Sequence, residues 1–279
     1  MKDRREGYRF LLPAAVVLLF VTVYPLFYVF WLSLHRRHLI FDISRFSGLE
    51  NYIFLLQDER FLRALWNTVY FTVLSVGLEL VLGMVVALSL QRAFSGRGIV
   101  RALVLLPWAL PTVVSARMWE WMYNTDFGII NYLLGVDVNW LGSPFWALNA
   151  AVLMDVWKTT PFVALILMAG LQVIPRELYR SAMVDGAGSL YIFWRITLPL
   201  LKPVILVVLL FRTIDAFRVF DAIYVLTGGG PANTTETLSI YAYKVLFQTL
   251  QFGYGSTIAM VVFLCVGFIS VFYVRLLSR

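Results

Sequence analysis

The sequence predicts an all-α, polytopic membrane protein, and three observations support this fold class. Of the residues, 61% are hydrophobic and only 14% are charged, and the mean hydropathy is +0.80. Six apolar stretches are long enough to cross a bilayer, and Lys and Arg are spread unequally over the segments that connect them. A chain of 279 residues with so little polar surface is not a water-soluble globule.

Each predicted span is an apolar run close to the roughly 20 helical residues that cross about 30 Å of hydrocarbon. The first run is too long for a secretory signal and lacks a clear small-residue cleavage site, so we expect it to be retained. We expect residues 1–279 to form a single transmembrane domain. The six transmembrane helices are predicted at residues 10–34, 68–90, 102–121, 147–171, 203–226 and 256–276.

The orientation follows from Lys and Arg, because cytoplasmic segments carry an excess of them. With the N-terminus inside, the inner segments hold 13 of the 23 and the outer segments seven. We therefore expect both termini in the cytoplasm and the chain in the cell (inner) membrane. The net charge of +7 follows from this bias, and no basic run suits a nucleic acid. The inner residues are Lys2, Arg4, Arg5, Arg9, Arg92, Arg97, Arg101, Arg176, Arg180, Arg195, Lys202, Arg275 and Arg279.

Two predicted outer segments have distinct character. Residues 41–63 suggest a short strand or turn followed by an amphipathic helix on the membrane surface. The segment TGGGPANTT, residues 227–235, cannot be regular structure, because three glycines and a proline make its backbone costly to order. Taken alone, it is consistent with a flexible loop.

Residues 175–203, reading PRELYRSAMVDGAGSLYIFWRITLPLLKP, form a long non-spanning segment between two apolar spans. Its opening proline suits the first turn of a helix, and Gly186 suits a left-handed helix stop. A second helix can begin at Ser189 and is expected to end where Leu198 precedes Pro199. Its aromatic residues indicate either a partner protein or a loop that lies on lipid.

The same segment resembles the EAA loop of permease subunits of ABC importers, which implies the type I ABC importer permease fold. In that family the loop is cytoplasmic and seats in a groove of the ATPase subunit. This chain has Arg-Ser-Ala where the family usually has Glu-Ala-Ala. The motif positions are Asp185-Gly186-Ala187, Phe193, Ile196, Leu198-Pro199-Leu200 and Pro203, and the implied ATPase-coupling residues are Arg180, Ser181, Ala182, Asp185, Gly186 and Ala187.

The resemblance also implies the partners. They are a second homologous permease subunit, a dimer of ATP-binding subunits that holds ATP and Mg, and an extracytoplasmic sugar-binding protein or lipoprotein. Residues 227–235 resemble the outer loop that faces this binding protein in maltose and other carbohydrate permeases. The chain has no G-x-x-x-x-G-K-[ST] motif, so we expect no ATP hydrolysis by it. No metal site, cofactor or catalytic group is expected, since the two histidines, His35 and His38, lie on a surface turn.

Ionisable residues within spans each cost roughly 2.5–3.5 kcal/mol and should therefore face protein or a wet cavity. Residues that are three or four positions apart along a helix share a face, so two polar stripes are expected, one in the fourth span and one in the fifth. The seven residues are Glu79, Asp155, Lys158, Arg212, Asp215, Arg218 and Asp221. The stripes are Asp155, Lys158, Thr159 and Phe162, then Arg212, Asp215, Ala216 and Val219.

These stripes have two interpretations. The charges can neutralise one another as i, i+3 ion pairs, namely Asp155 with Lys158, Arg212 with Asp215, and Arg218 with Asp221. Alternatively, some of them bind sugar hydroxyls. The resemblance supports the second interpretation, because in the maltose permease subunit the sugar-contacting positions match these two stripes, which are therefore the predicted substrate-binding residues.

The sequence does not identify the cargo. A disaccharide such as trehalose or maltose fits the stripes, and a glycerol-phosphate-type ABC permease remains an alternative because the cations tolerate an anion. A proton-coupled secondary transporter, with Asp155, Asp215 or Asp221 as the protonation site, is a rival. A membrane receptor or scaffold would leave the seven charges unexplained.

Overall fold

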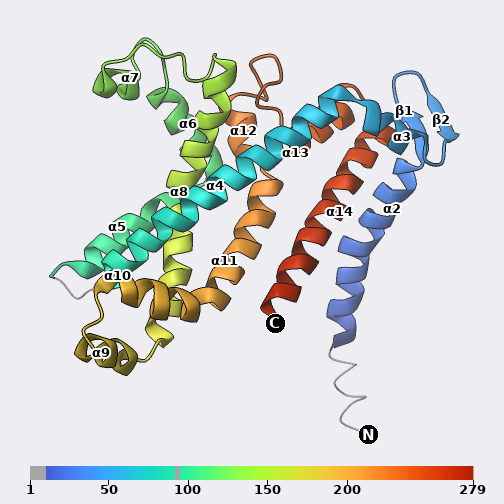
Figure 1. The fold of residues 1–279 in the computed structure, drawn as a ribbon. Coiled ribbons are helices and arrows are strands. Elements are labelled where there is room, and N and C mark those ends of the chain that lie inside the picture. Colours follow the sequence, from blue (N-terminus) through green and yellow to red (C-terminus); the bar gives the residue numbers. More distant parts are fainter. Residues whose placement is uncertain (1–10, 92–94, 279) are drawn as a thin grey trace, which may run out of the picture. The chain divides into compact units, whose positions relative to one another are not determined.

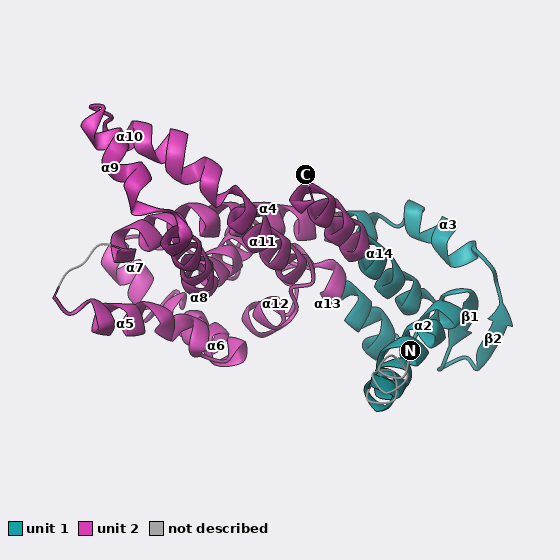
Figure 2. Cartoon of the chain, turned by 90° about the horizontal axis from the view of Figure 1, so that it is seen from below, with its two compact units in different colours: residues 1–62, 241–264 teal, residues 63–240, 265–279 magenta. Residues whose placement is uncertain are grey.

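The computed structural model describes residues 11–91 and 95–278, and the regular structure there is helical apart from one antiparallel hairpin. The chain forms two compact units, residues 1–62 with 241–264 and residues 63–240 with 265–279 (Figure 2). Of the predicted inner residues and span ends, Lys2, Arg4, Arg5, Arg9, Phe10, Arg92 and Arg279 lie outside the described residues.

The expected all-α, multi-span architecture is confirmed. Within the described part of the chain, five helices are long and apolar enough to cross a membrane, or up to six crossings if one bent helix pair counts as a span. The five are Leu11–Ser33, Glu59–Gln91, Pro144–Val173, Ser189–Phe217 and Phe252–Leu277, and the bent pair is Arg97–Ala109 with Thr112–Met122.

The first unit contains the hairpin, shown in blue in Figure 1. The side-chain amide of Asn51 donates to the carbonyls of Ser33 at 2.9 Å and His35 at 3.0 Å, which joins helix and hairpin. The strand-then-helix pattern is as predicted, but the helix is interrupted at Asp58, whose ψ of 103° is extended. The elements are η1 (Leu19–Val23), α2 (Tyr24–Ser33), β1 (His35–His38), β2 (Ile43–Phe46), α3 (Glu50–Gln57), η3 (Lys244–Gln248) and the first part of α14 (Phe252–Leu277).

The second unit is built around α8 (Pro144–Val173), which is largely buried and contacts α5, α6, α11 and α12. Gly83 of α4 allows a close approach to α8, because an added Cβ would lie 2.6 Å from Val163 Cγ1. The remaining elements are α4 (Glu59–Gln91) from residue 63 onward, α5 (Arg97–Ala109), α6 (Thr112–Met122), α7 (Ile129–Leu134), α9 (Arg176–Val184), α10 (Ser189–Ile192), η2 (Phe193–Thr197), α11 (Leu198–Phe217), α12 (Asp221–Leu226) and α13 (Leu238–Tyr243) up to residue 240.

The predicted span at residues 102–121 is not one continuous helix. Helices α5 and α6 meet at an angle of 94° instead. Pro111 explains the break, since proline lacks the N–H of a helix interior and forces the residue before it out of the helical conformation. Leu110 is accordingly extended, with φ −73° and ψ 141°.

The predicted boundary at Leu198 is also wrong, because α10 continues through η2 into α11 without a stop. In η2 the hydrogen bonds run from residue i to residue i+5, as from Leu198 N–H to the Phe193 carbonyl. This wider turn lets Pro199 occupy the first turn of α11, where its missing N–H costs little. The predicted span at residues 203–226 likewise ends early, at Phe217, and Asp221 begins the separate helix α12.

The predicted glycine stop is confirmed. Helix α9 ends at Val184, and Gly186 has φ +81°. The Gly186 N–H donates to the Met183 carbonyl at 3.1 Å, and the Ala187 N–H donates to the Ala182 carbonyl at 2.9 Å. These bonds satisfy carbonyls that the end of α9 would otherwise leave free.

Candidate functional site

A cavity of about 340 Å³ lies within the second unit, between α8, α11, the start of α12 and the break between α5 and α6. Polar side chains from two separate spans meet there, as the two predicted stripes require. Seven of the eight predicted substrate-binding residues line it, namely Asp155, Lys158, Thr159, Arg212, Asp215, Ala216 and Val219. That a substrate contacts them stays a prediction.

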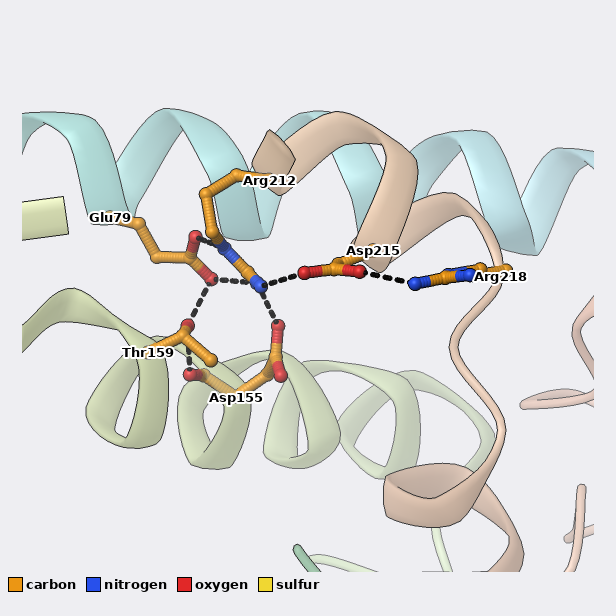
Figure 3. Close-up of polar contacts among 6 residues, drawn as sticks. All are labelled: Glu79, Asp155, Thr159, Arg212, Asp215 and Arg218. Carbon is orange, nitrogen blue, oxygen red and sulfur yellow. Dashed lines mark hydrogen bonds and ion pairs between the residues drawn. The ribbon is translucent and has the colours of Figure 1, made fainter. Parts of the chain in front are cut away.

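Arg212 is the centre of a buried ion-pair network that joins α4, α8 and α11 (Figure 3). Its Nε donates to Oε2 of Glu79 at 2.6 Å, and its Nη2 donates to Oε1 at 2.9 Å. The same Nη2 also donates to Oδ2 of Asp155 at 3.1 Å. The side chain of Glu79 is fully buried and that of Arg212 is 6% exposed. A bidentate pair of this kind holds both charges in a fixed orientation.

The network continues toward the exposed end of α11. Asp215 lies 3.9 Å from Nη1 of Arg212 and accepts a hydrogen bond from Nη2 of Arg218 at 2.8 Å. On the other side, the Thr159 hydroxyl lies 2.6 Å from both Oε1 of Glu79 and the Asp155 carbonyl oxygen, and it has one proton to donate. The charges thus form a chain from a buried carboxylate to an exposed guanidinium, as Figure 3 shows.

Lys158 does not form the expected ion pair with Asp155. Its Nζ donates to the carbonyl oxygens of Leu110 at 2.8 Å and Trp108 at 3.5 Å, at the end of α5. A cation is favoured there because the carbonyls at a helix C-terminus lack helical partners and carry partial negative charge. The expected pair of Arg218 with Asp221 is also wrong, since Arg218 bonds to Asp215.

The aromatic side chains of α8 pack mainly on other aromatic residues rather than on the cavity. Phe162, the eighth predicted residue, stacks on Trp108 with ring centroids 5.6 Å apart and does not line the cavity. Trp157 packs edge-on against Trp119. The aromatic residues that line the cavity are Trp108 and Phe220.

Glu79 belongs to the ion-pair network, although the predicted substrate-binding stripes do not include it. It is an ionisable residue within a span, and its own helix has no residue of opposite charge three or four positions away. A lone acid on an apolar helix must find its counter-charge on another helix. That was the signal for its pairing with Arg212.

The predicted coupling residues gather at a surface hollow of about 690 Å³. Five of the six line it, and Arg180 does not. Apolar side chains nearby are exposed, with 87% of Val184 and 58% of Trp194 accessible. The five are Ser181, Ala182, Asp185, Gly186 and Ala187.

The glycine-rich loop at residues 227–235 is irregular, as predicted, yet threonine hydroxyls tie it together. The hydroxyls of Thr227 and Thr235 lie 2.7 Å apart, and that of Thr235 is also 2.7 Å from the Gly230 carbonyl. Thr235 and Thr237 are fully buried. The loop therefore has internal hydrogen bonds that a sequence of glycines does not reveal.

Comparison with known proteins identifies the family. Residues 79–279 match the family described as the binding-protein-dependent transport system inner membrane component. The chain belongs to this family of ABC transporter permeases. It is 45% identical over 278 residues to the trehalose/maltose transport system permease protein MalF of Thermococcus litoralis, covering 98% of this chain and 94% of that one.

Two further similarities agree with this family assignment. The chain is 42% identical to the trehalose transport system permease protein SugA of Mycobacterium tuberculosis, over 99% of this chain and 90% of the relative. A crystal structure of a bacterial ABC transporter that imports the acidic polysaccharide alginate superposes with a TM-score of 0.85 at 25% identity, covering all of this chain and 96% of that one. The predicted type I importer permease fold is confirmed. The described residues contain no group of three or more His, Cys, Asp or Glu side chains placed to hold a metal ion.

Proposed function

We propose that this permease forms half of the translocation path for an uncharged sugar, such as trehalose or maltose, in an ATP-driven importer. The observation that carries the proposal is the meeting of both polar stripes at one cavity. Its volume of about 340 Å³ lies at the lower end of the roughly 300–1,000 Å³ of small-molecule sites. A homologous permease subunit would supply the facing wall.

The cations at the cavity already have hydrogen-bond partners, which favours an uncharged cargo over an anion. Lys158 donates to two carbonyls, Arg212 to two carboxylates and Arg218 to a third. None of these cations faces the cavity without a partner. An anion such as glycerol phosphate would have to displace one of the ion pairs, whereas sugar hydroxyls can donate to the carboxylates already present.

Uptake by the complete complex tests this proposal. Proteoliposomes that contain this chain with its partner permease, ATPase subunits and binding protein should take up labelled trehalose or maltose only with ATP, and glycerol phosphate should not compete. Liposomes with this chain alone should show no uptake driven by a pH gradient. Proton-driven uptake by the single chain would contradict the proposal. Competition by glycerol phosphate would show that the cargo is an anion of this class and not an uncharged sugar.

We also propose that residues 175–203 dock on the ATPase, which binds ATP and Mg, and that residues 227–235 face the binding protein. In this arrangement both termini are cytoplasmic and residues 1–279 act as one permease domain. The hollow beside Gly186, with its exposed apolar neighbours, supports the docking role, because such surfaces mark partner sites.

A matched pair of glycine variants tests the docking. Gly186→Val forces a β-branched residue to φ +81°, whereas Gly188→Val places it at φ −71°, and neither added Cβ would meet an atom within 4 Å. We expect Gly186→Val to lower substrate-stimulated ATPase activity severalfold and Gly188→Val to leave it near wild type. Equal activity of both variants would remove Gly186 from the coupling residues.

A further inference from the structure

A second cavity, of about 480 Å³, lies within the first unit beside the β1–β2 hairpin. Arg36, Arg37 and His38 of β1 line it, together with residues of α3 and the start of α14. None of the predicted sites includes it. Basic residues outnumber acidic ones in this lining. Glu50 is the single carboxylate among the lining residues, and it already lies 3.3 Å from Arg45.

The cations of this cavity lack counter-charges. No carboxylate lies within 4 Å of Arg36 or Arg37 anywhere in the residues that the structure describes, and Arg36 is directly opposite Arg45 in the hairpin. Like charges facing each other across a strand pair are destabilising. The buried Nδ1 of His38 also has no hydrogen-bond partner. An anion with several acceptor oxygens would satisfy all three residues.

The position of the cavity beside the ends of two candidate spans indicates the source of that anion. The span Leu11–Ser33 ends two residues before β1, and Gln251 and Tyr254 of the lining lie at the start of the span Phe252–Leu277. At no more than about 3.3 Å per residue, Arg36 lies within about 10 Å of the end of the first span. This is the level of the lipid headgroups.

The hairpin also carries apolar side chains suited to a lipid interface. Leu39 is 54% exposed, Ile40 62% and Phe41 70%, and all three lie in the turn between the arginine-bearing strand and β2. Basic residues combined with exposed apolar ones favour binding to an anionic membrane surface. A free phosphate ion would use the arginines but leave these apolar side chains uncovered.

We propose that the hairpin cavity binds the phosphate headgroup of an anionic phospholipid, with Arg36 and Arg37 contacting the phosphate oxygens and His38 bonding through Nδ1. Arginine suits this role because its planar donor fork matches phosphate oxygens. The site depends on the chain spanning a membrane and not on which cargo it carries.

Lipid retention by the purified complete complex tests the site. We would reconstitute wild type and Arg36→Gln/Arg37→Gln in nanodiscs of phosphatidylcholine, with or without phosphatidylglycerol, and count retained lipids by native mass spectrometry. Wild type should prefer phosphatidylglycerol, and the double variant should lose at least about tenfold of that preference, as expected for two charged hydrogen bonds. Arg117→Gln, an exposed arginine of α6, is the control and should keep it.

Three outcomes would overturn the proposal. The first is an unchanged preference in the double variant. The second is equal thermal stabilisation of wild type by inorganic phosphate in phosphatidylcholine alone, which identifies a free anion as the ligand. The third is unchanged lipid retention with loss of stimulation by the binding protein, which identifies a protein-docking surface. If the double variant does not assemble, Arg37→Gln alone removes one of the two charges, and Arg36→Lys/Arg37→Lys keeps both charges and tests the donor fork of arginine.

Discussion

Glu79 in the second unit and Asp58 in the first unit each accept hydrogen bonds from residues that are distant in the sequence, but the partners differ. Glu79 accepts two hydrogen bonds from Arg212, a residue 133 positions away. Asp58 accepts hydrogen bonds from the hydroxyls of Tyr241 and Tyr254, both at 2.5 Å. Both carboxylates therefore fasten segments that are distant in the sequence.

The difference follows from where the carboxylates lie. Glu79 is fully buried inside a span, where an unpaired charge is very costly, so it needs a partner of opposite charge. Asp58 lies at the break between α3 and α4 and is only part-buried, so neutral donors are sufficient. The backbone N–H of Arg60 also donates to it at 2.9 Å.

The largest expected effect comes from breaking the charged pair. Arg212→Gln leaves Glu79 buried without its counter-charge and should destabilise the protein by about 3–5 kcal/mol. Glu79→Gln with Arg212→Gln should recover the part of this loss that belongs to Glu79, because two amides can bond to each other, but not the part due to Asp155, which still lacks its counter-charge. Thermal unfolding of the complex in nanodiscs measures both variants.

Uptake by the double variant then separates structure from transport. A stable double variant that no longer takes up labelled disaccharide would place Arg212 in contact with the cargo. Normal uptake would make the pair purely structural and remove Arg212 from the predicted substrate residues. A double variant as unstable as the single one would contradict the ion pair itself.

Asp58→Ala should have a smaller effect, on the order of 1–3 kcal/mol, because it leaves two hydroxyls without an acceptor but no unpaired charge. Hydrogen exchange should accelerate in α3 and at the start of α14. Asp126→Ala, which changes an exposed aspartate in another loop, is the control. A loss as large as that of Arg212→Gln would show that a carboxylate bound by hydroxyls contributes as much stability as one bound by a guanidinium.

Removing a single tyrosine hydroxyl should destabilise the protein less than Asp58→Ala. Tyr241→Phe and Tyr254→Phe should each destabilise the protein by about 1 kcal/mol, and the two effects should not add because both hydroxyls share one acceptor. Tyr132→Phe, at a tyrosine that is 86% exposed, should be neutral. Simple additivity in thermal unfolding would argue against the shared carboxylate.

The smallest expected effect is a dependence on pH. Burial raises the pKa of Asp58, but the hydrogen bonds from Tyr241, Tyr254 and the backbone outweigh it and hold the pKa below the ordinary value. A lowered pKa in the folded state gives stability that is present above the unfolded value, near 4, and is lost as the pH falls through the folded value. Wild type should therefore lose stability relative to Asp58→Asn only below about pH 4. A difference that disappears between pH 5 and 7 would contradict this assignment.

The sequence predicted much of the site because helical spacing is a local property. Residues three and four apart share a face whatever the helix packs against, so Asp155, Lys158 and Thr159 could be grouped without a structure. The left-handed turn at Gly186 was predictable for the same reason, since its strain belongs to one residue. The helix breaks were harder to predict from the sequence, because proline has two different outcomes here. The wider turn of η2 accommodates Pro199 within a continuous helix, whereas α5 ends before Pro111.

The sequence by itself determined that the chain spans a membrane, that two of its helices carry polar stripes, and that a glycine corner divides the segment between them. Only the tertiary structure decided which charges pair. Spacing along one helix suggests partners such as Asp155 with Lys158, but Arg212 takes its main partner from α4 and Lys158 bonds to the end of α5. Distances between helices are set by how their surfaces pack, as at Gly83 against Val163, and no periodicity within a single helix contains that information.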